Sequence, residues 1–298
     1  KGREAFREPR IAYWNVPLMR DEKIVERPAD QHTLTKRYTE EAVKFIRANK
    51  EKPFFLYLAH TMVHVPLFAS KDFAGKSPRG PYGDAIEEVD WSVGEVLQAI
   101  RAAGIDKTTW VTFTSDNGPW LIFREQGGSA GPLREGKGST WEGGMREPGV
   151  MWWPGTIPAG AVNHDIACTM DLFVTAAKLA GAKVPADRPI DGYDLSATMT
   201  GKGPGPRDVM FYYRDTKLYA VRQGPWKAHF VTRAGYGSAK PEAHDPPLVF
   251  HLGHDPGEQY DQSKQRPDVV ARLTKLAAEH RAGMKPGEPQ LDARLPKK

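Results

Sequence analysis

Apolar residues recur at helical spacing in three segments of the first two thirds of the chain. Residues 33–50 place apolar side chains on one face and charged side chains opposite, and residues 84–103 repeat the pattern before Gly104. Residues 171–181 show a shorter version of it. We therefore predict three amphipathic helices, the second of which stops at Gly104 because glycine favours the conformation that closes a helix.

Apolar runs of strand length lie among these helices, at residues 54–59, 110–114 and 150–153. They are rich in aromatic and β-branched residues, which pack well on a pleated surface. Strands that alternate with helices are typical of an α/β sandwich around a largely parallel sheet. We predict this architecture for residues 1–205.

The pattern changes after residues 201–206, a stretch rich in glycine and proline. Short strands separated by turns follow, and an amphipathic helix is predicted at residues 268–281. The predicted strands are 209–213, 218–222, 227–231 and 248–251. We expect a small antiparallel sheet with one helix packed on it, which forms a second domain over residues 206–298.

Composition narrows the class of protein without identifying it. The 298 residues are 40% hydrophobic and 27% charged, as in an ordinary soluble globular protein. No apolar run is long enough to span a bilayer, and no basic stripe with interleaved aromatics favours nucleic acid. The net charge of +5 suits an anionic substrate, but it is equally typical of a solvated surface. The single cysteine excludes an internal disulfide, and the sequence leaves the oligomeric state open.

Two adjacent oxygen donors, Asp116 and Asn117, follow the predicted strand 110–114. A carboxylate and an amide carbonyl are hard ligands that suit Ca²⁺ or Mg²⁺. Asp-Asn-Gly is also a common turn sequence, so an Asx turn that merely ends the strand is the alternative. About 20 residues later, Lys137 lies between two glycines, where the backbone can approach an anion closely. A solvated lysine in a flexible loop is the alternative there.

Two histidines are further candidates. His64, in His-Val-Pro, comes shortly after the run 54–59, and a histidine can donate a proton to a leaving group near neutral pH. A structural role at the strand end is the alternative. His244, in Ala-His-Asp-Pro-Pro, is expected in a loop before the last strand, where it contacts substrate or simply belongs to a surface turn. We interpret Glu142, Arg146 and Glu147 as residues that fix the conformation of the glycine-rich loop, residues 136–148.

These motifs together resemble the formylglycine-dependent sulfatases, in particular the arylsulfatase A-like and N-acetylgalactosamine-6-sulfatase-like group. Their order and spacing carry the resemblance. The matching stretches are residues 53–60, 64–66, 115–119, 136–148, 191–195 and 255–258. The resemblance implies an alkaline-phosphatase-like α/β sandwich, present here in part, and hydrolysis of a sulfate ester. It also implies a periplasmic, extracellular or lysosomal-type location.

The resemblance assigns roles to the candidate residues. Asp116 and Asn117 would complete a Ca²⁺ site, and Lys137 would bind the sulfate and help its leaving group. His64 would bind the sulfate ester and protonate the departing oxygen, and His244 would lie near the substrate. The expected partner is an aryl, glycolipid or glycan sulfate.

One departure limits what this chain can do. The family's nucleophile is a formylglycine made from the first residue of a Cys/Ser-x-Pro-x-Arg motif, and these 298 residues contain no such motif. Cys168 precedes Thr-Met-Asp, so it does not fit. We expect the C-terminal portion of a sulfatase, which is inactive alone. The alternatives are a phosphonate or phosphodiester hydrolase of the same superfamily and a non-catalytic module that binds sulfated glycans.

Overall fold

The computed structural model describes residues 2, 4–237, 239–285 and 287. The chain divides into two compact units. The first unit is Lys1–Val111 with Trp120–Gly128, and the second is Thr112–Pro119 with Ser129–Lys298. No helix among the described residues is both long enough and apolar enough to cross a membrane. The domain boundary at residues 205 and 206 stays a prediction.

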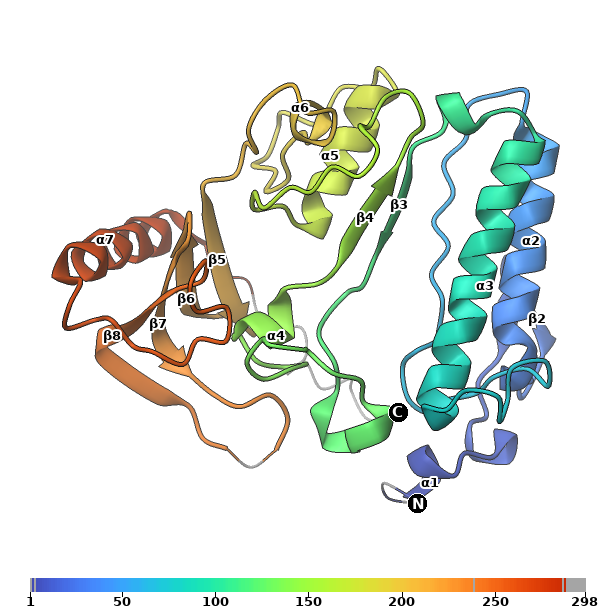
Figure 1. Ribbon diagram of the computed structural model, residues 1–298, viewed down its shortest axis with the longest axis horizontal. Helices are drawn as coiled ribbons and strands as arrows, with labels where there is room; N and C mark the ends of the chain where they lie inside the picture. The colour runs from blue at the N-terminus through green and yellow to red at the C-terminus, as the bar shows by residue number, and fades with distance from the viewer. Residues whose placement is uncertain (1, 3, 238, 286, 288–298) are drawn as a thin grey trace. The chain divides into compact units, whose positions relative to one another are not determined.

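The first unit is built around two long helices that lie side by side (Figure 1). Its elements are α1 (Glu4–Arg7), η1 (Ile11–Tyr13), β1 (Leu18–Arg20), β2 (Lys23–Glu26), η2 (Gln31–Thr33), α2 (Leu34–Asn49), α3 (Gly80–Ala102), η3 (Asp106–Thr108) and η4 (Leu121–Gln126). Thr39 of α2 and Ser92 of α3 form a buried hydrogen bond of 2.6 Å between their hydroxyls. Two of the predicted helices, 33–50 and 84–103, are confirmed as α2 and α3.

The predicted strand 54–59 is wrong. Residues 53–60 belong to no strand, because no strand among the described residues pairs with them. The apolar run that prompted the prediction is present, and its side chains alternate in exposure: Phe54 and Leu56 are half-buried, whereas Phe55 and Tyr57 are 77% and 80% exposed. Alternation alone does not make a strand, which also needs a neighbour to hydrogen-bond its backbone.

A pair of strands lies at the predicted positions, β3 (Val111–Thr114), which belongs to the second unit from Thr112 on, and β4 (Gly149–Trp152). Figure 1 draws their arrows in opposite directions, so the parallel pairing expected for this layer is not found between them. Helix α5 (Thr169–Leu179) confirms the third predicted helix. The short helices α4 (Glu142–Met145) and α6 (Ser196–Met199) complete this part.

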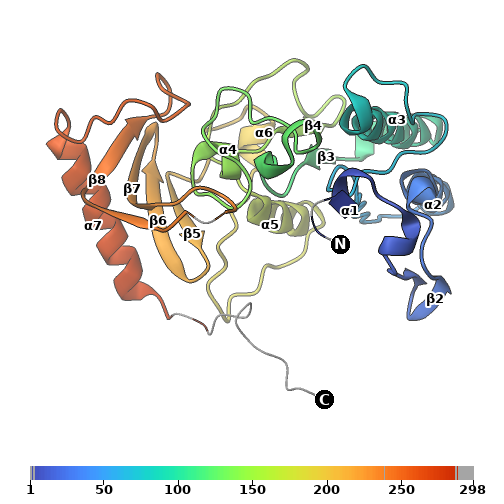
Figure 2. The same cartoon turned by 90° about the horizontal axis from the view of Figure 1, so that it is seen from below.

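The C-terminal part of the second unit is an antiparallel sheet in the order β5-β6-β7-β8. Its elements are β5 (Val209–Arg214), β6 (Lys217–Gln223), β7 (Trp226–Thr232), β8 (Glu242–His251) and α7 (Pro267–Gly283). Helix α7 covers one face (Figure 2), where Val221, Val249 and Leu273 are fully buried. The predicted sheet-plus-helix is therefore confirmed.

Candidate functional site

The Asp-Asn turn follows β3 directly. Asp116 is exposed and Asn117 half-buried, and the side-chain amide of Asn117 donates a hydrogen bond to the carboxylate of Asp116. The hydroxyl of Ser115 donates to the carbonyl of Asn117 at 3.2 Å. The turn therefore holds both oxygen-bearing side chains together at the end of the strand.

The glycine-rich loop is hydrogen-bonded to this turn through the backbone. The N–H of Lys137 donates to the carbonyl of Pro119 at 2.9 Å, and the N–H of Gly118 donates to Gly144 at 3.2 Å. The approach requires glycine, since a Cβ atom added to Gly118 would lie 1.9 Å from the carbonyl oxygen of Gly143. The backbone of Lys137 is therefore hydrogen-bonded to Pro119, which follows Asn117 by two residues.

A cluster of buried charges anchors the same loop to the sheet. Lys227, fully buried on β7, donates to the carbonyl of Thr140 and to the carboxylate of Glu142, both at 2.8 Å. Its ammonium also lies 3.2 Å from Glu258, whose carboxylate accepts from the N–H of Glu142 at 2.7 Å. The interpretation of Glu142 as a residue that fixes the loop is confirmed.

The charge states of this cluster follow from burial and from its ion pairs. Burial opposes ionisation of Glu258, but the Lys227 ammonium and the His229 hydrogen bond outweigh it and lower the pKa of Glu258 to about 2. Burial lowers the pKa of His229 to about 4, so its Nε2–H donates to Glu258 while the ring stays neutral. The two carboxylates raise the pKa of Lys227 despite its burial.

Lys227 and His229 were predicted only as strand residues. They are two positions apart, so they share one face of β7, opposite the face that Ala228 turns toward α7. A lysine and a histidine at this spacing in an otherwise apolar strand are the one local sign of the cluster. Their partners are 85 and 29 residues away along the chain, beyond the reach of local patterns.

Glu147 is a second residue whose environment the sequence did not predict. It is half-buried, and burial raises its pKa to about 7, with a further contribution from the negative charge of Asp116. Glu147 and Arg146 line a hollow of about 280 Å³. The other lining residues, all in the second unit, are Pro119, Ser129, Ala130, Leu133, Gly143 and Pro148.

His64 belongs to the first unit, whereas Asp116, Asn117 and Lys137 belong to the second. It is exposed, and its ring lies 5.3 Å from that of Trp120. Its Nδ1 is 2.7 Å from the carbonyl of Val65, which fixes the ring and makes Nε2 the outward nitrogen for proton transfer. Its neighbour His60 is half-buried against Ser92 of α3 at 3.3 Å, and burial lowers its pKa.

The loop predicted around His244 is wrong, because the residue lies inside β8. Its Nε2 is 2.8 Å from the hydroxyl of Thr232 on the neighbouring strand β7. Pro246 and Pro247 belong to the same strand, which tolerates them because β8 is at the edge of the sheet, where a missing N–H can face solvent. A role of His244 in substrate binding stays a prediction.

Cys168 has a structural role. It is the N-cap of α5, and its N–H donates to the carboxylate of Asp171 at 2.8 Å. Burial raises the pKa of the Cys168 thiol, which opposes the thiolate that a nucleophile needs. The geometry agrees with the sequence argument that Cys168 is not the family's nucleophile.

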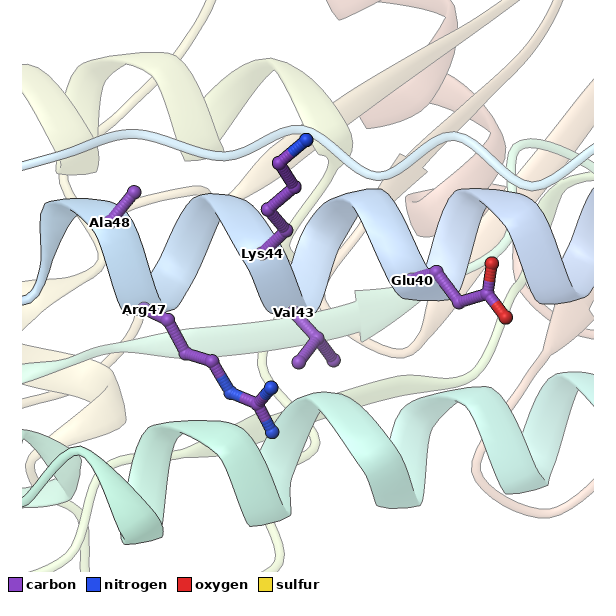
Figure 3. Close-up of a pocket in the computed structure, with 5 residues that line it drawn as sticks. All are labelled: Glu40, Val43, Lys44, Arg47 and Ala48. Atoms are coloured by element: carbon purple, nitrogen blue, oxygen red, sulfur yellow. The ribbon is translucent and has the colours of Figure 1, made fainter.

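A hollow in the first unit contains none of the predicted site residues. It lies along α2, has a volume of about 550 Å³ and is shown in Figure 3. Its lining residues are Glu40, Val43, Lys44, Arg47 and Ala48. One carboxylate and two flexible cations on a single helix provide no converging set of ligands. The glycine-rich loop therefore remains the better candidate for the functional site.

Comparison with known proteins defines the class. The family model for sulfatases matches residues 2–182, and the model for the C-terminal region of aryl-sulfatase matches residues 205–297. The chain belongs to the sulfatase family, as the motifs predicted.

The chain is also similar in sequence to individual sulfatases. The chain is 43% identical to N-acetylgalactosamine-6-sulfatase of Mus musculus over 93% of its own length and 60% of that protein. It is 41% identical to human arylsulfatase A over 76% of its own length and 48% of that protein. The chain therefore spans about half to 60% of the length of these relatives.

The fold is also similar to that of a solved sulfatase structure. The crystal structure of the PsFucS1 sulfatase from Pseudoalteromonas sp. matches 86% of this chain and 55% of that chain, with 29% identity and a TM-score of 0.80. The predicted alkaline-phosphatase-like α/β class, together with the C-terminal antiparallel sheet, is thereby confirmed.

Proposed function

We propose that the protein containing this chain hydrolyses sulfate esters, and that Asp116, Asn117, Lys137 and His64 are its contribution to the active site. One observation carries the proposal. The loop that holds Lys137 is hydrogen-bonded to the turn that holds Asp116 and Asn117, which puts a cation and hard oxygen ligands on one support. That pairing suits a sulfate group together with a divalent metal ion.

Asp116 and Asn117 fit a Ca²⁺ site in part. Their side-chain oxygens are hard donors at a strand end, and Asp116 is exposed enough to reach an ion. No cluster of three or more His, Cys, Asp or Glu side chains suited to a metal occurs among the described residues. The pair therefore supplies only some of the ligands. When bound, Ca²⁺ would neutralise negative charge on the sulfate oxygens.

Formylglycine does not fit any residue of this chain. The one cysteine caps a helix and lacks the required motif. The roles left to this chain are binding and proton transfer. The Lys137 ammonium would neutralise charge on the sulfate. His64, protonated on both nitrogens, would give its Nε2 proton to the alcohol oxygen as the S–O bond breaks and keep the Nδ1–H on the Val65 carbonyl.

The expected substrate is an aryl or carbohydrate sulfate. The relatives named above include an N-acetylgalactosamine-6-sulfatase and an arylsulfatase. A site that recognises the sulfate through a lysine and a metal ion suits both alcohols, because neither group contacts the alcohol part.

The test compares turnover of nitrocatechol sulfate by residues 1–298 and by the whole protein, including any segment that precedes Lys1. We expect no turnover by residues 1–298, which lack a formylglycine precursor, and turnover by the whole protein. Robust activity of residues 1–298 would overturn the assignment of the nucleophile to another segment. Faster hydrolysis of an aryl phosphonate monoester would favour the phosphonate hydrolase, and binding without turnover would favour the glycan-binding module.

The whole protein also separates metal binding from proton transfer. Asp116→Ala should lower Ca²⁺ affinity and turnover together, and excess Ca²⁺ should partly restore turnover. His64→Ala should leave Ca²⁺ affinity nearly intact and slow alkyl sulfates by roughly a hundred- to ten-thousand-fold. Activated aryl sulfates should slow less, because their phenoxides leave with little protonation. Equal losses on both substrate types would show that His64 only positions the sulfate.

A further inference from the structure

The turn after β7 lies directly against the glycine-rich loop. A Cβ atom added to Gly235 would be 2.4 Å from the carbonyl oxygen of Lys137. A Cβ atom added to Gly138, where φ is +85°, would be 2.8 Å from the ring of Tyr236. The Tyr236 ring therefore occupies the space that a side chain at position 138 would fill, one residue along from Lys137.

This turn is held in place from two directions. The guanidinium of Arg214, on β5, donates to the carbonyls of Ala234 and Gly235 at 3.1 and 3.0 Å. From the loop side, the carboxylate of Glu135 accepts from the N–H of Gly235 at 3.4 Å. The position of Tyr236 is thus set by the sheet and the loop together, as a binding surface requires.

Tyr236 is nevertheless 47% exposed. A large aromatic ring that is partly exposed can stack on the face of a flat or C–H-rich ring. Tyr236 lies against the residue that follows Lys137, so a ring stacked on it would lie beside the loop that carries Lys137.

We propose that Tyr236 is a specificity-determining residue, which stacks on the ring of the alcohol whose sulfate Lys137 binds. The inference rests on the proposed function and extends it from the sulfate to the alcohol. The shared chemistry is a six-membered ring that carries the sulfate, either a pyranose or an arene. An acyclic alkyl sulfate would gain nothing from Tyr236.

The experiment uses the whole protein with Tyr236→Ala, Tyr236→Phe and the control Tyr260→Ala, a 70% exposed tyrosine in the same unit. The probes are N-acetylgalactosamine 6-sulfate, 4-nitrophenyl sulfate and inorganic sulfate as a ring-free inhibitor. Tyr236→Ala should raise KM for the ring-bearing esters about five- to tenfold, with kcat and the sulfate inhibition constant unchanged. Tyr236→Phe and Tyr260→Ala should behave like the wild type.

An effect on the sugar ester alone would identify the pyranose as the ring, and an effect on the aryl ester alone would identify the arene. Unchanged KM for both would overturn the proposal. An equal weakening of inorganic sulfate binding would also overturn it, because Tyr236 would then only support the loop. If the wild type turns over no sulfate ester, the proposed function fails first. Calorimetric binding of the sugar sulfate to the same variants would then decide the role of Tyr236 separately.

Discussion

The C-terminal sheet and the segment 53–60 both contain apolar runs of strand length, with opposite structural outcomes. In the sheet every strand has a hydrogen-bonded neighbour, and Val221 and Val249 are fully buried in a cluster with Leu273 of α7. In segment 53–60 half-buried and exposed side chains alternate, yet Phe55 and Tyr57 are largely exposed and no described strand pairs with the segment. Alternation decides which way side chains point, whereas a partner decides whether a strand forms.

The two faces of the C-terminal sheet are also unlike each other. Apolar contacts with α7 fill one face, and the ion cluster around Lys227 fills the other, against the glycine-rich loop. Truncating a side chain should lower stability on both faces, through lost apolar packing on one and through unpaired buried charges on the other. Truncating an exposed side chain in segment 53–60 should lower stability little. Four measurements of unfolding sharpen this contrast.

The largest loss is expected for Lys227→Met. The substitution keeps much of the side-chain volume but leaves the buried carboxylates of Glu142 and Glu258 without their shared cation. Breaking such a group from one side costs about 3–5 kcal/mol, which denaturant unfolding would measure. Lys275→Met is the control, because that side chain is exposed on α7. A loss below about 1 kcal/mol would mean that water or rearranged partners replace the ammonium.

The apolar face gives the next effect. Leu273→Ala removes a fully buried side chain between α7 and the sheet and should cost about 2–5 kcal/mol, since the cavity collapses only partly. Thr274→Ala, exposed on the same helix, should change the free energy of unfolding little. Comparable losses from both variants would indicate an effect on helix formation and not on packing.

Acidification should weaken the ion-cluster face first. The pKa of His229 is lowered to about 4 in the folded protein, so below its usual value of 6.5 the unfolded chain binds the proton more readily. Stability should therefore fall between about pH 6.5 and 4, by on the order of 1–3 kcal/mol. Glu258, with its pKa lowered to about 2, should add a further loss from about pH 4.5 downward. His229→Gln should flatten only the first part of the profile, measured by denaturant unfolding at each pH.

The same contrast explains which features could be predicted from sequence. The strands of the C-terminal sheet follow one another along the chain, so short runs of strand-forming residues and the turns between them were sufficient. The Asp-Asn turn and Lys137 were recognisable because short motifs carry their chemistry. The ion cluster was not, because Lys227 meets Glu142 across 85 positions. His244 was misplaced because the last strand was expected to begin only at residue 248, whereas β8 begins at Glu242.

The smallest effect is expected in segment 53–60. The double variant Phe55→Ser with Tyr57→Ser removes two side chains that are already mostly in water, so the free energy of unfolding of residues 1–298 should change by less than about 0.5 kcal/mol. Leu58→Ser is the matched control. Leu58 is half-buried, so its replacement should lower the free energy of unfolding more. Thermal and urea unfolding of the three proteins would measure both. If the double variant lost more than the control, Phe55 and Tyr57 would have to be covered in solution, and the segment would have found the partner that a strand requires.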